Sequence, residues 1–322
     1  MFTRIELKDF RGFRELTLDG LQRVNLVVGK NNAGKTSLLE AIAILADPMS
    51  VADMATLFRE EQGAYSRRFY RWLIREAPGV RRAELAARAP GTSRQTALGR
   101  SLLAAPSWSQ VAQCRNVSHK TGVLADTFVW TTAGQEPLLY RSLSGHHGNP
   151  DVLVEAVARA VRQSDGEQRL ESLLRSVDPR VRRVRVDVAE DGKALLVDLG
   201  LGEMVPLTQA GQGLYRLTGV FAELLGGQPQ VCFIDEVENG IHHSILPDIW
   251  AGIAEVAQRL GIQVFATTHS FECIEAAHEA FSKRSSYDFS VVQLFRLEDG
   301  VQGRVLQRDM IEAGIEGNID LR

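Results

Sequence analysis

Residues 29–36 have the residue types and spacing of a loop that binds phosphate. Gly29, Gly34, Lys35 and Thr36 occupy the fixed positions of the pattern G-x-x-x-x-G-K-[S/T]. The glycines let backbone N–H groups curl around a polyphosphate, the lysine reaches its terminal phosphates, and the hydroxyl can bind Mg²⁺. We therefore expect ATP and Mg²⁺ as cofactors, with these residues binding the nucleotide: Gly29, Lys30, Asn31, Asn32, Ala33, Gly34, Lys35, Thr36 and Ser37.

The flanking residues supply the strand and the helix that such a loop requires. The apolar run over residues 24–28 predicts a buried strand that leads into the loop. Leu38, Leu39, Ile42 and Leu45 recur at helical spacing after it, and the helix is expected to end before Asp47-Pro48.

Two carboxylates follow a second apolar run, over residues 231–234, in the pattern called Walker B. Asp235 can hold Mg²⁺ together with Thr36, and Glu236 can polarise the water that attacks the terminal phosphate. Four apolar residues before Asp-Glu are a weak signal alone, but they become a strong one downstream of a phosphate-binding loop.

A third apolar run, residues 262–268, ends in His269 and Ser270. Polar residues at the carboxyl end of a parallel strand lie where ligands bind in open α/β sheets, so His269 is a candidate sensor of the terminal phosphate. A metal pair formed by His269 and Cys273 is disfavoured, because His269 falls at the strand end before the next helix begins.

A glycine-rich turn over residues 206–213 leads into a further predicted helix. Such a turn is another anion site, and Gln209, Gly211 and Gly213 are candidate nucleotide contacts there. The phosphate-binding loop of the same chain does not need this turn, so we expect the turn to face the nucleotide bound by a second subunit.

These motifs together carry a resemblance to a known group. Residues 10–13 (FRGF), the phosphate loop, residues 208–213, the run IDEVENGIH over residues 234–242 and ATTHS over residues 266–270 resemble the ABC-type ATPase heads of the SMC, RecF and OLD group, and more narrowly the stand-alone OLD-like ATP-binding proteins. The resemblance covers roughly residues 1–46 and 180–322. It implies an α/β fold, that of an ABC-type P-loop NTPase head with a mixed sheet and N-terminal antiparallel strands.

The resemblance also assigns roles. Lys35, Glu236 and His269 would be the catalytic lysine, base and switch histidine, Thr36 and Asp235 the Mg²⁺ ligands, and Arg11 a nucleotide contact. Residues 238–242 would contact a second subunit. The turn departs from the pattern, with Gln209 and Gln212 where such proteins more usually carry Ser and Asp. Four residues are candidates for the glutamine of the loop that bears that name in such proteins: Gln62, Gln95, Gln110 and Gln113.

We interpret the 322 residues as one ATPase domain in three parts: a first nucleotide lobe over 1–48, an Arg-rich helical and β insertion over 49–180, and the signature, Walker B and switch part over 181–322. Between Arg59 and Arg100 lie ten arginines and four glutamates, with aromatic residues among them. One interpretation of this stretch is a surface that binds nucleic acid or an acidic protein partner. The other is a helical face exposed to solvent.

Charge, the N-terminal residues and the cysteine pattern exclude several other classes of protein. The net charge of −3 excludes a chain that is basic throughout, and the N-terminus lacks the layout of a signal peptide, so we expect a cytoplasmic protein without a membrane span. Cys114, Cys232 and Cys273 form no C-x-x-C pair, which argues for buried reduced thiols. His146-His147 lacks neighbouring ligands and is expected in a loop.

The sequence therefore predicts a head that hydrolyses ATP, forms a homodimer around two nucleotides and drives a separate effector protein, such as a nuclease, in anti-phage defence or DNA maintenance. The insertion lacks heptads for a coiled coil, and no appended nuclease domain is expected. The alternative is a non-catalytic scaffold in which bound ATP holds or sequesters an effector.

Overall fold

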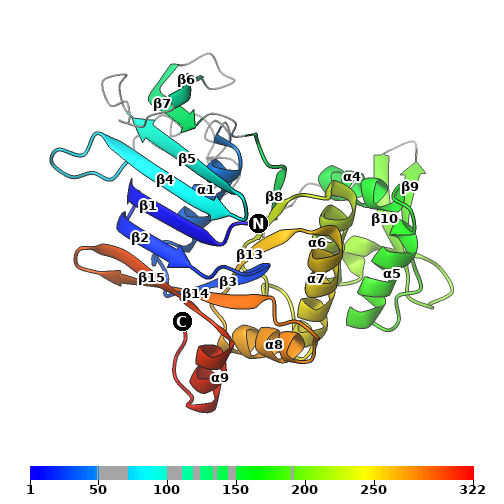
Figure 1. Ribbon diagram of the computed structural model, residues 1–322. Coiled ribbons are helices and arrows are strands. Elements are labelled where there is room, and N and C mark those ends of the chain that lie inside the picture. Colours follow the sequence, from blue (N-terminus) through cyan, green and yellow to red (C-terminus); the bar gives the residue numbers. More distant parts are fainter. Residues whose placement is uncertain are drawn as a thin grey trace.

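The computed structural model describes residues 1–48, 50, 72–99, 111–118, 124–132, 136–143, 150–189 and 192–322. In this part of the chain, helices pack against two six-stranded sheets and one three-stranded sheet (Figure 1). The predicted α/β class with a mixed sheet and N-terminal antiparallel strands is confirmed. No helix among the described residues is long and apolar enough to cross a membrane.

The central sheet brings the three predicted motifs to one edge. Its strands lie in the order β15-β14-β3-β13-β12-β8, and all run parallel except β15, which is antiparallel to β14. Because parallel strands end at the same edge, the segments that follow β3, β12 and β13 meet there. The strands are β3 (Val24–Val28), β8 (Tyr140–Leu143), β12 (Val231–Ile234), β13 (Gln263–Thr267), β14 (Phe289–Leu297) and β15 (Gly300–Leu306).

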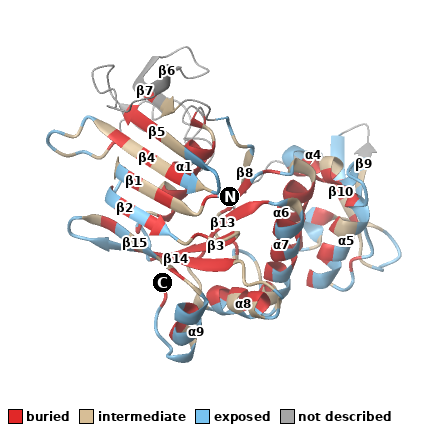
Figure 2. Ribbon diagram, viewed as in Figure 1, coloured by how far each residue is buried: buried red, intermediate tan, exposed pale blue. Residues whose placement is uncertain are grey.

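Both faces of this sheet are covered, so every residue of β3 and β12 is buried. Successive side chains of a strand point to opposite faces. On β12, Val231 and Phe233 join a core that contains α1 (Lys35–Ala46), whereas Cys232 and Ile234 join a core built from helices on the other face. Figure 2 shows β3 and β13 buried along their length.

The second six-stranded sheet is antiparallel and packs on the outer side of α1. Its order is β2-β1-β4-β5-β7-β6, and its apolar faces share one core with α1 and with Phe233 and Phe265 of the central sheet. The strands are β1 (Arg4–Phe10), β2 (Phe13–Asp19), β4 (Arg82–Ala89), β5 (Thr92–Gly99), β6 (Val111–Ser118) and β7 (Leu124–Thr132).

This sheet joins part of the predicted insertion over residues 49–180 to the first nucleotide lobe. Strand β4 pairs directly with β1, in a register that places Leu85 opposite Leu7, and β8 extends the central sheet beside β12. Within the predicted helical and β insertion, residues 82–99 form two strands. The first nucleotide lobe and the predicted insertion therefore share one framework.

Helices cover the other face of the central sheet, with a small sheet beyond them. The three-stranded sheet has the order β11-β10-β9, in which β9 and β10 form an antiparallel hairpin, and two helices precede it in the chain. The elements are α4 (Pro150–Val161), α5 (Gly166–Val177), β9 (Arg183–Ala189), β10 (Gly192–Asp198), β11 (Val205–Pro206), α6 (Gln212–Gly227) and α7 (Leu246–Leu260). Helices α8 (Phe271–Ser282) and α9 (Arg308–Glu316) complete the described chain.

The turn between β1 and β2 is tied to α1 by a buried ion pair. Arg11 has a backbone φ of 53°, and its guanidinium binds Glu40 of α1 with two hydrogen bonds of 2.9 and 3.2 Å. The Glu40 side chain is fully buried and that of Arg11 is 8% exposed. A carboxylate at this depth requires a charged partner.

Replacing Glu40 with glutamine should lower the free energy of unfolding by about 3–5 kcal/mol, because it leaves the Arg11 charge buried without its partner. Urea denaturation measures this change. Glu279→Gln, which breaks an exposed pair with Lys283 on α8, is the matched control and should have little effect. A loss below about 1 kcal/mol in Glu40→Gln would contradict the importance of the pair.

Candidate functional site

The loop after β3 has the shape that its glycines allow. Gly29 and Gly34 have φ values of 151° and 95°, which side chains rarely adopt. A Cβ at Gly29 would lie 2.5 Å from the carbonyl oxygen of Leu294, and one at Gly34 would lie 3.2 Å from the ring of Phe13. The loop therefore needs glycine at both motif positions, and α1 begins at Lys35, directly after it.

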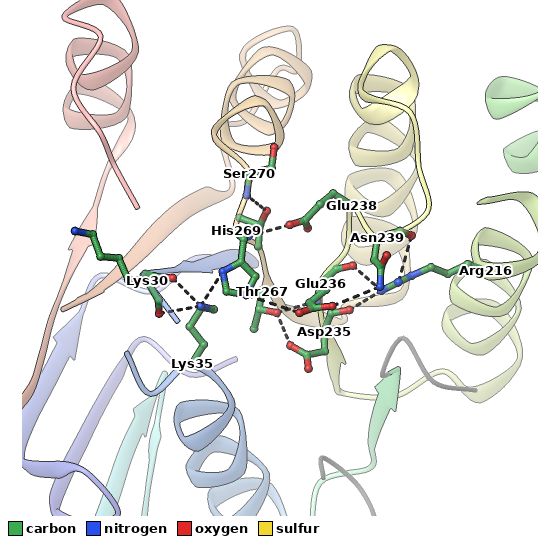
Figure 3. Close-up of polar contacts among 12 residues, drawn as sticks. Lys30, Lys35, Arg216, Asp235, Glu236, Glu238, Asn239, Thr267, His269 and Ser270 are labelled. Carbon is green, nitrogen blue, oxygen red and sulfur yellow. Dashed lines mark hydrogen bonds and ion pairs between the residues drawn. The ribbon is translucent and has the colours of Figure 1, made fainter. Parts of the chain in front are cut away.

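Lys35 is buried at the centre of the site. Its Nζ donates to the carbonyl oxygens of Gly29 at 2.6 Å and Lys30 at 3.3 Å, and lies 3.3 Å from Nδ1 of His269 (Figure 3). Burial lowers the pKa of Lys35, and three nearby carboxylates oppose this shift: Asp235, Glu236 and Glu238. The ammonium is thus held where a bound polyphosphate would replace the loop carbonyls as its partner.

Asp235 and Glu236 follow β12 and are fixed by a residue at the end of β13. The hydroxyl of Thr267 donates to Oδ1 of Asp235 and accepts from the backbone N–H of Glu236 at 2.8 Å. Glu236 has a φ of 49°, a left-handed conformation that is costly for a residue with a side chain. This backbone turns the Glu236 side chain toward His269.

His269 links the lysine to the glutamate. Since an ammonium can only donate, Nδ1 accepts from Lys35, which leaves the ring proton of a neutral His269 on Nε2. Nε2 lies 3.7 Å from Oε1 of Glu236. The backbone N–H of His269 donates to Oε1 of Glu238 at 2.8 Å. The side chains of Lys35, His269 and Glu236 thus form a line across the sheet edge.

Other predicted residues lie at the site's margin or elsewhere. Arg11 binds Glu40, so its nucleotide contact stays a prediction. Thr36 and Ser37 are half-buried in the first turn of α1. Gln209 and Gly211 are exposed, and a Cβ at Gly211 would meet open space, whereas one at Gly213 would lie 3.0 Å from the carbonyl oxygen of Gly240.

Sequence reasoning missed the positioning roles of Thr267, Arg216 and Glu238, the last of which it assigned only to the contact with a second subunit. The hydroxyl of Thr267 binds the Asp235 carboxylate and the backbone N–H of Glu236, and Glu238 holds the backbone of His269. Arg216 of α6 binds the carbonyl oxygens of Asp235, Glu236 and Asn239. The paired threonines before His269 were a usable signal for Thr267, because hydroxyls at a strand end can orient neighbouring acids. The contacts of Arg216 had no local signal.

The oxygen donors fit Mg²⁺. Asp235 offers a carboxylate whose orientation Thr267 fixes, and Thr36 offers a hydroxyl at the start of α1. Among the residues described, no group of three or more His, Cys, Asp or Glu could hold a metal ion. This combination suits an ion that keeps waters and binds substrate phosphates rather than one enclosed by protein ligands.

Part of the Arg-rich stretch, residues 72–99, lies within the described residues. Arg67, Arg68 and Arg71 lie outside the described residues, as do Gln62, Gln110 and His146-His147. Three described arginines bind partners within the fold: Arg75 pairs with Asp9 at 2.8 Å, Arg82 pairs with Glu84, and Arg94 donates to backbone carbonyls. Gln95 lies on β5 and Gln113 on β6. The binding surface and the glutamine loop both stay predictions.

Cys232 and Cys273 are buried and free, as predicted, whereas the same prediction for Cys114 lies outside the described side chains. Burial raises the pKa of Cys273 to about 12 and raises that of Cys232 further. Both thiols are therefore poor nucleophiles and poor metal ligands at neutral pH.

Comparison with known proteins agrees with this geometry. Residues 127–275 match the family model described as "AAA domain, putative AbiEii toxin, Type IV TA system", and residues 1–66 match one described as "AAA ATPase domain". An "ATP/GTP phosphatase" of Helicobacter pylori is 21% identical over 332 residues, which cover 88% of this chain and 89% of that protein. A "DNA replication and repair protein RecF" of Lactobacillus gasseri is 58% identical over 41 residues, only 13% of this chain and 11% of RecF.

Solved structures share the fold. An SMC head bound to the C-winged helix domain of ScpA has a TM-score of 0.62 at 12% identity, with 95% of this chain and 97% of that chain covered. The SMC head domain from Thermotoga maritima has a TM-score of 0.54 at 13% identity, with 95% and 99% covered. At such identities the likeness shows the fold alone.

Proposed function

We propose that this chain, an ATPase of the ABC and AAA type in the SMC and RecF group, dimerises around two ATP molecules and uses their hydrolysis to drive a partner protein. The observation that carries the proposal is the convergence of Lys35, Asp235, Glu236 and His269 from three separate elements on one sheet edge. Positioned charge of this kind is the main source of catalysis in phosphoryl transfer.

Each of these side chains has a distinct task in the proposed reaction. Lys35 neutralises charge on the β and γ phosphates, and Glu236 orients the attacking water and accepts its proton. His269, held through its backbone by Glu238, contacts the γ-phosphate and adjusts the position of Glu236. A Mg²⁺ ion bound by Asp235 and Thr36 would supply further positive charge beside the phosphates.

The dimer is proposed from the exposed turn at Gln209–Gly213 and the exposed residues Asn239, Gly240, His242 and His243 beyond Walker B. The two segments meet at the start of α6, where Gly213 in the first turn of the helix packs against Gly240. A turn of backbone N–H groups at a helix start suits the phosphate of a nucleotide that a second copy presents.

The Glu236→Gln variant should double its mass in light scattering when Mg-ATP is added, because slow hydrolysis leaves the nucleotide bound between the two copies. Lys35→Ala is the matched control and should stay a monomer in both conditions. A Glu236→Gln monomer with Mg-ATP would contradict the nucleotide sandwich. A dimer without nucleotide would assign the contact to another surface.

The partner is proposed to be a separate effector protein, such as a nuclease, in anti-phage defence or DNA maintenance. Support comes from the relatives: RecF is named for DNA replication and repair, and an SMC head was solved bound to a domain of ScpA. Nucleic acid binding through Arg59–Arg100 is a further part of the proposal. Affinity purification from the native host with Glu236→Gln and ATP, followed by mass spectrometry, tests for the effector, with Lys35→Ala as the control.

A second candidate is a scaffold that binds ATP with negligible turnover. The exposed Gln209 is the observation that favours it, together with Gln212, since these residues stand where related heads more usually carry Ser and Asp. The two candidate functions differ in the rate of ATP hydrolysis, which a comparison of the wild type with Glu236→Gln measures.

A further inference from the structure

Arg216 binds the backbone on which Glu236 is mounted. The residue lies in the second turn of α6, and one terminal nitrogen of its guanidinium donates to the carbonyl oxygens of Asp235 at 2.5 Å and Glu236 at 2.6 Å. The other donates to the carbonyl oxygen of Asn239 at 3.3 Å. A single side chain thus joins both ends of the turn that carries the proposed catalytic base (Figure 3).

This turn is held in an unfavourable conformation. Glu236 has a φ of 49°, which costs on the order of 1–3 kcal/mol and persists only where the surroundings enforce it. Thr267 holds the N–H of Glu236 from the side of β13, and Arg216 holds its carbonyl oxygen from the side of α6. The peptide groups on both sides of Glu236 are therefore fixed by two different elements.

The same helix begins at the exposed turn that we propose to contact a second nucleotide. Gly211 caps α6, and Arg216 lies five residues later on the same rigid helix. At Gly213 the helix approaches Gly240 so closely that a Cβ would lie 3.0 Å from its carbonyl oxygen. A shift of the helix start would therefore move the guanidinium and the loop after Glu236 together.

We infer that Arg216 is a positioning residue that couples contacts at the turn Gln209–Gly213 to the orientation of Glu236. The inference rests on the proposed function for its trigger, the phosphate of a second subunit's nucleotide. Arginine is required because its planar fork binds several carbonyl oxygens in fixed directions, whereas a lysine ammonium lacks that geometry. Burial lowers the pKa of Arg216, and the nearby carboxylates of Glu238, Glu236 and Asp235 oppose this shift.

Arg216→Lys and Arg216→Gln test the coupling, with Tyr215→Phe on the same turn of α6 as the matched control. We expect kcat to fall about tenfold in the lysine variant and on the order of 10²-fold in the glutamine variant, the size expected when a catalytic group is misplaced by about 1 Å. The dissociation constant for ATP should stay within about twofold, because Lys35 and its loop are untouched. Tyr215→Phe should match the wild type in both quantities.

Hydrogen exchange provides a readout that does not need turnover. The amides of Val237, Asn239 and Ile241 are hydrogen-bonded within or beside this turn, and their exchange should become faster in both Arg216 variants but not in Tyr215→Phe. A wild-type protein that does not hydrolyse ATP would contradict the proposed function. Faster amide hydrogen exchange in the Arg216 variants would still support the positioning role of Arg216.

Three results would overturn the inference. One is unchanged kcat in both variants of an active enzyme, and another is unchanged exchange at Val237, Asn239 and Ile241. The third is joint loss of ATP binding and thermal stability in Arg216→Lys, which would make Arg216 a residue needed for folding rather than for coupling.

Discussion

Replacing Lys35 with alanine should weaken ATP binding by at least on the order of 10²-fold. The variant loses charge-assisted hydrogen bonds to the β and γ phosphates, which contribute about 1.5–3 kcal/mol each. Lys35 is placed for this role by its burial at the start of α1 and by its position between the loop carbonyls and His269. Isothermal titration calorimetry with Mg-ATP measures the change.

Lys30→Ala is the control for this measurement. The Lys30 side chain is exposed on the same loop, and its removal leaves the backbone N–H groups and Lys35 in place, so the affinity should change by less than about threefold. Circular dichroism of both variants checks that the fold survives. Unchanged affinity in Lys35→Ala would remove the interpretation of residues 29–36 as a phosphate-binding loop.

Replacing Glu236 with glutamine should slow ATP turnover by about tenfold to a hundredfold or more, while ATP binding is kept. The amide has the shape of the carboxylate but cannot accept the proton of the attacking water, and general-base catalysis contributes on this scale. The clamp on the backbone of Glu236 involves only its N–H and carbonyl groups, so the turn itself should persist. Phosphate release under single-turnover conditions measures the chemical step.

His269→Ala should also be slow, because it removes the side chain between Lys35 and Glu236. Glu15→Gln, an exposed position on β2 far from the motifs in sequence, serves as the matched control and should turn over at the wild-type rate. If the wild type shows no turnover above Glu236→Gln and His269→Ala, the scaffold candidate replaces the ATPase one. The ATP-binding measurement on Lys35→Ala would remain valid in that case.

The sequence by itself determined the parts of the site whose signals are local. Apolar runs of four to seven residues predicted β3, β12 and β13, and the polar residues directly after each run gave the loop, Asp235, Glu236 and His269 as candidates. The strand predictions are confirmed because strand burial depends on neighbouring residues, and the candidates meet because the ends of parallel strands share one edge of the sheet. The glycine pattern likewise encodes backbone angles that other residues rarely adopt.

Only the tertiary structure decided which distant segments pair and which side chains support the site. The pairing of β4 with β1 joins segments about 80 residues apart, and the sequence of neither strand indicates which strand it pairs with. The Arg11–Glu40 pair, the two bonds of Thr267 and the reach of Arg216 to three carbonyl oxygens depend on how whole elements are packed. The left-handed φ of Glu236 also depends on the tertiary structure. A residue with a side chain disfavours this backbone conformation, and contacts from β13 and α6 hold it in place.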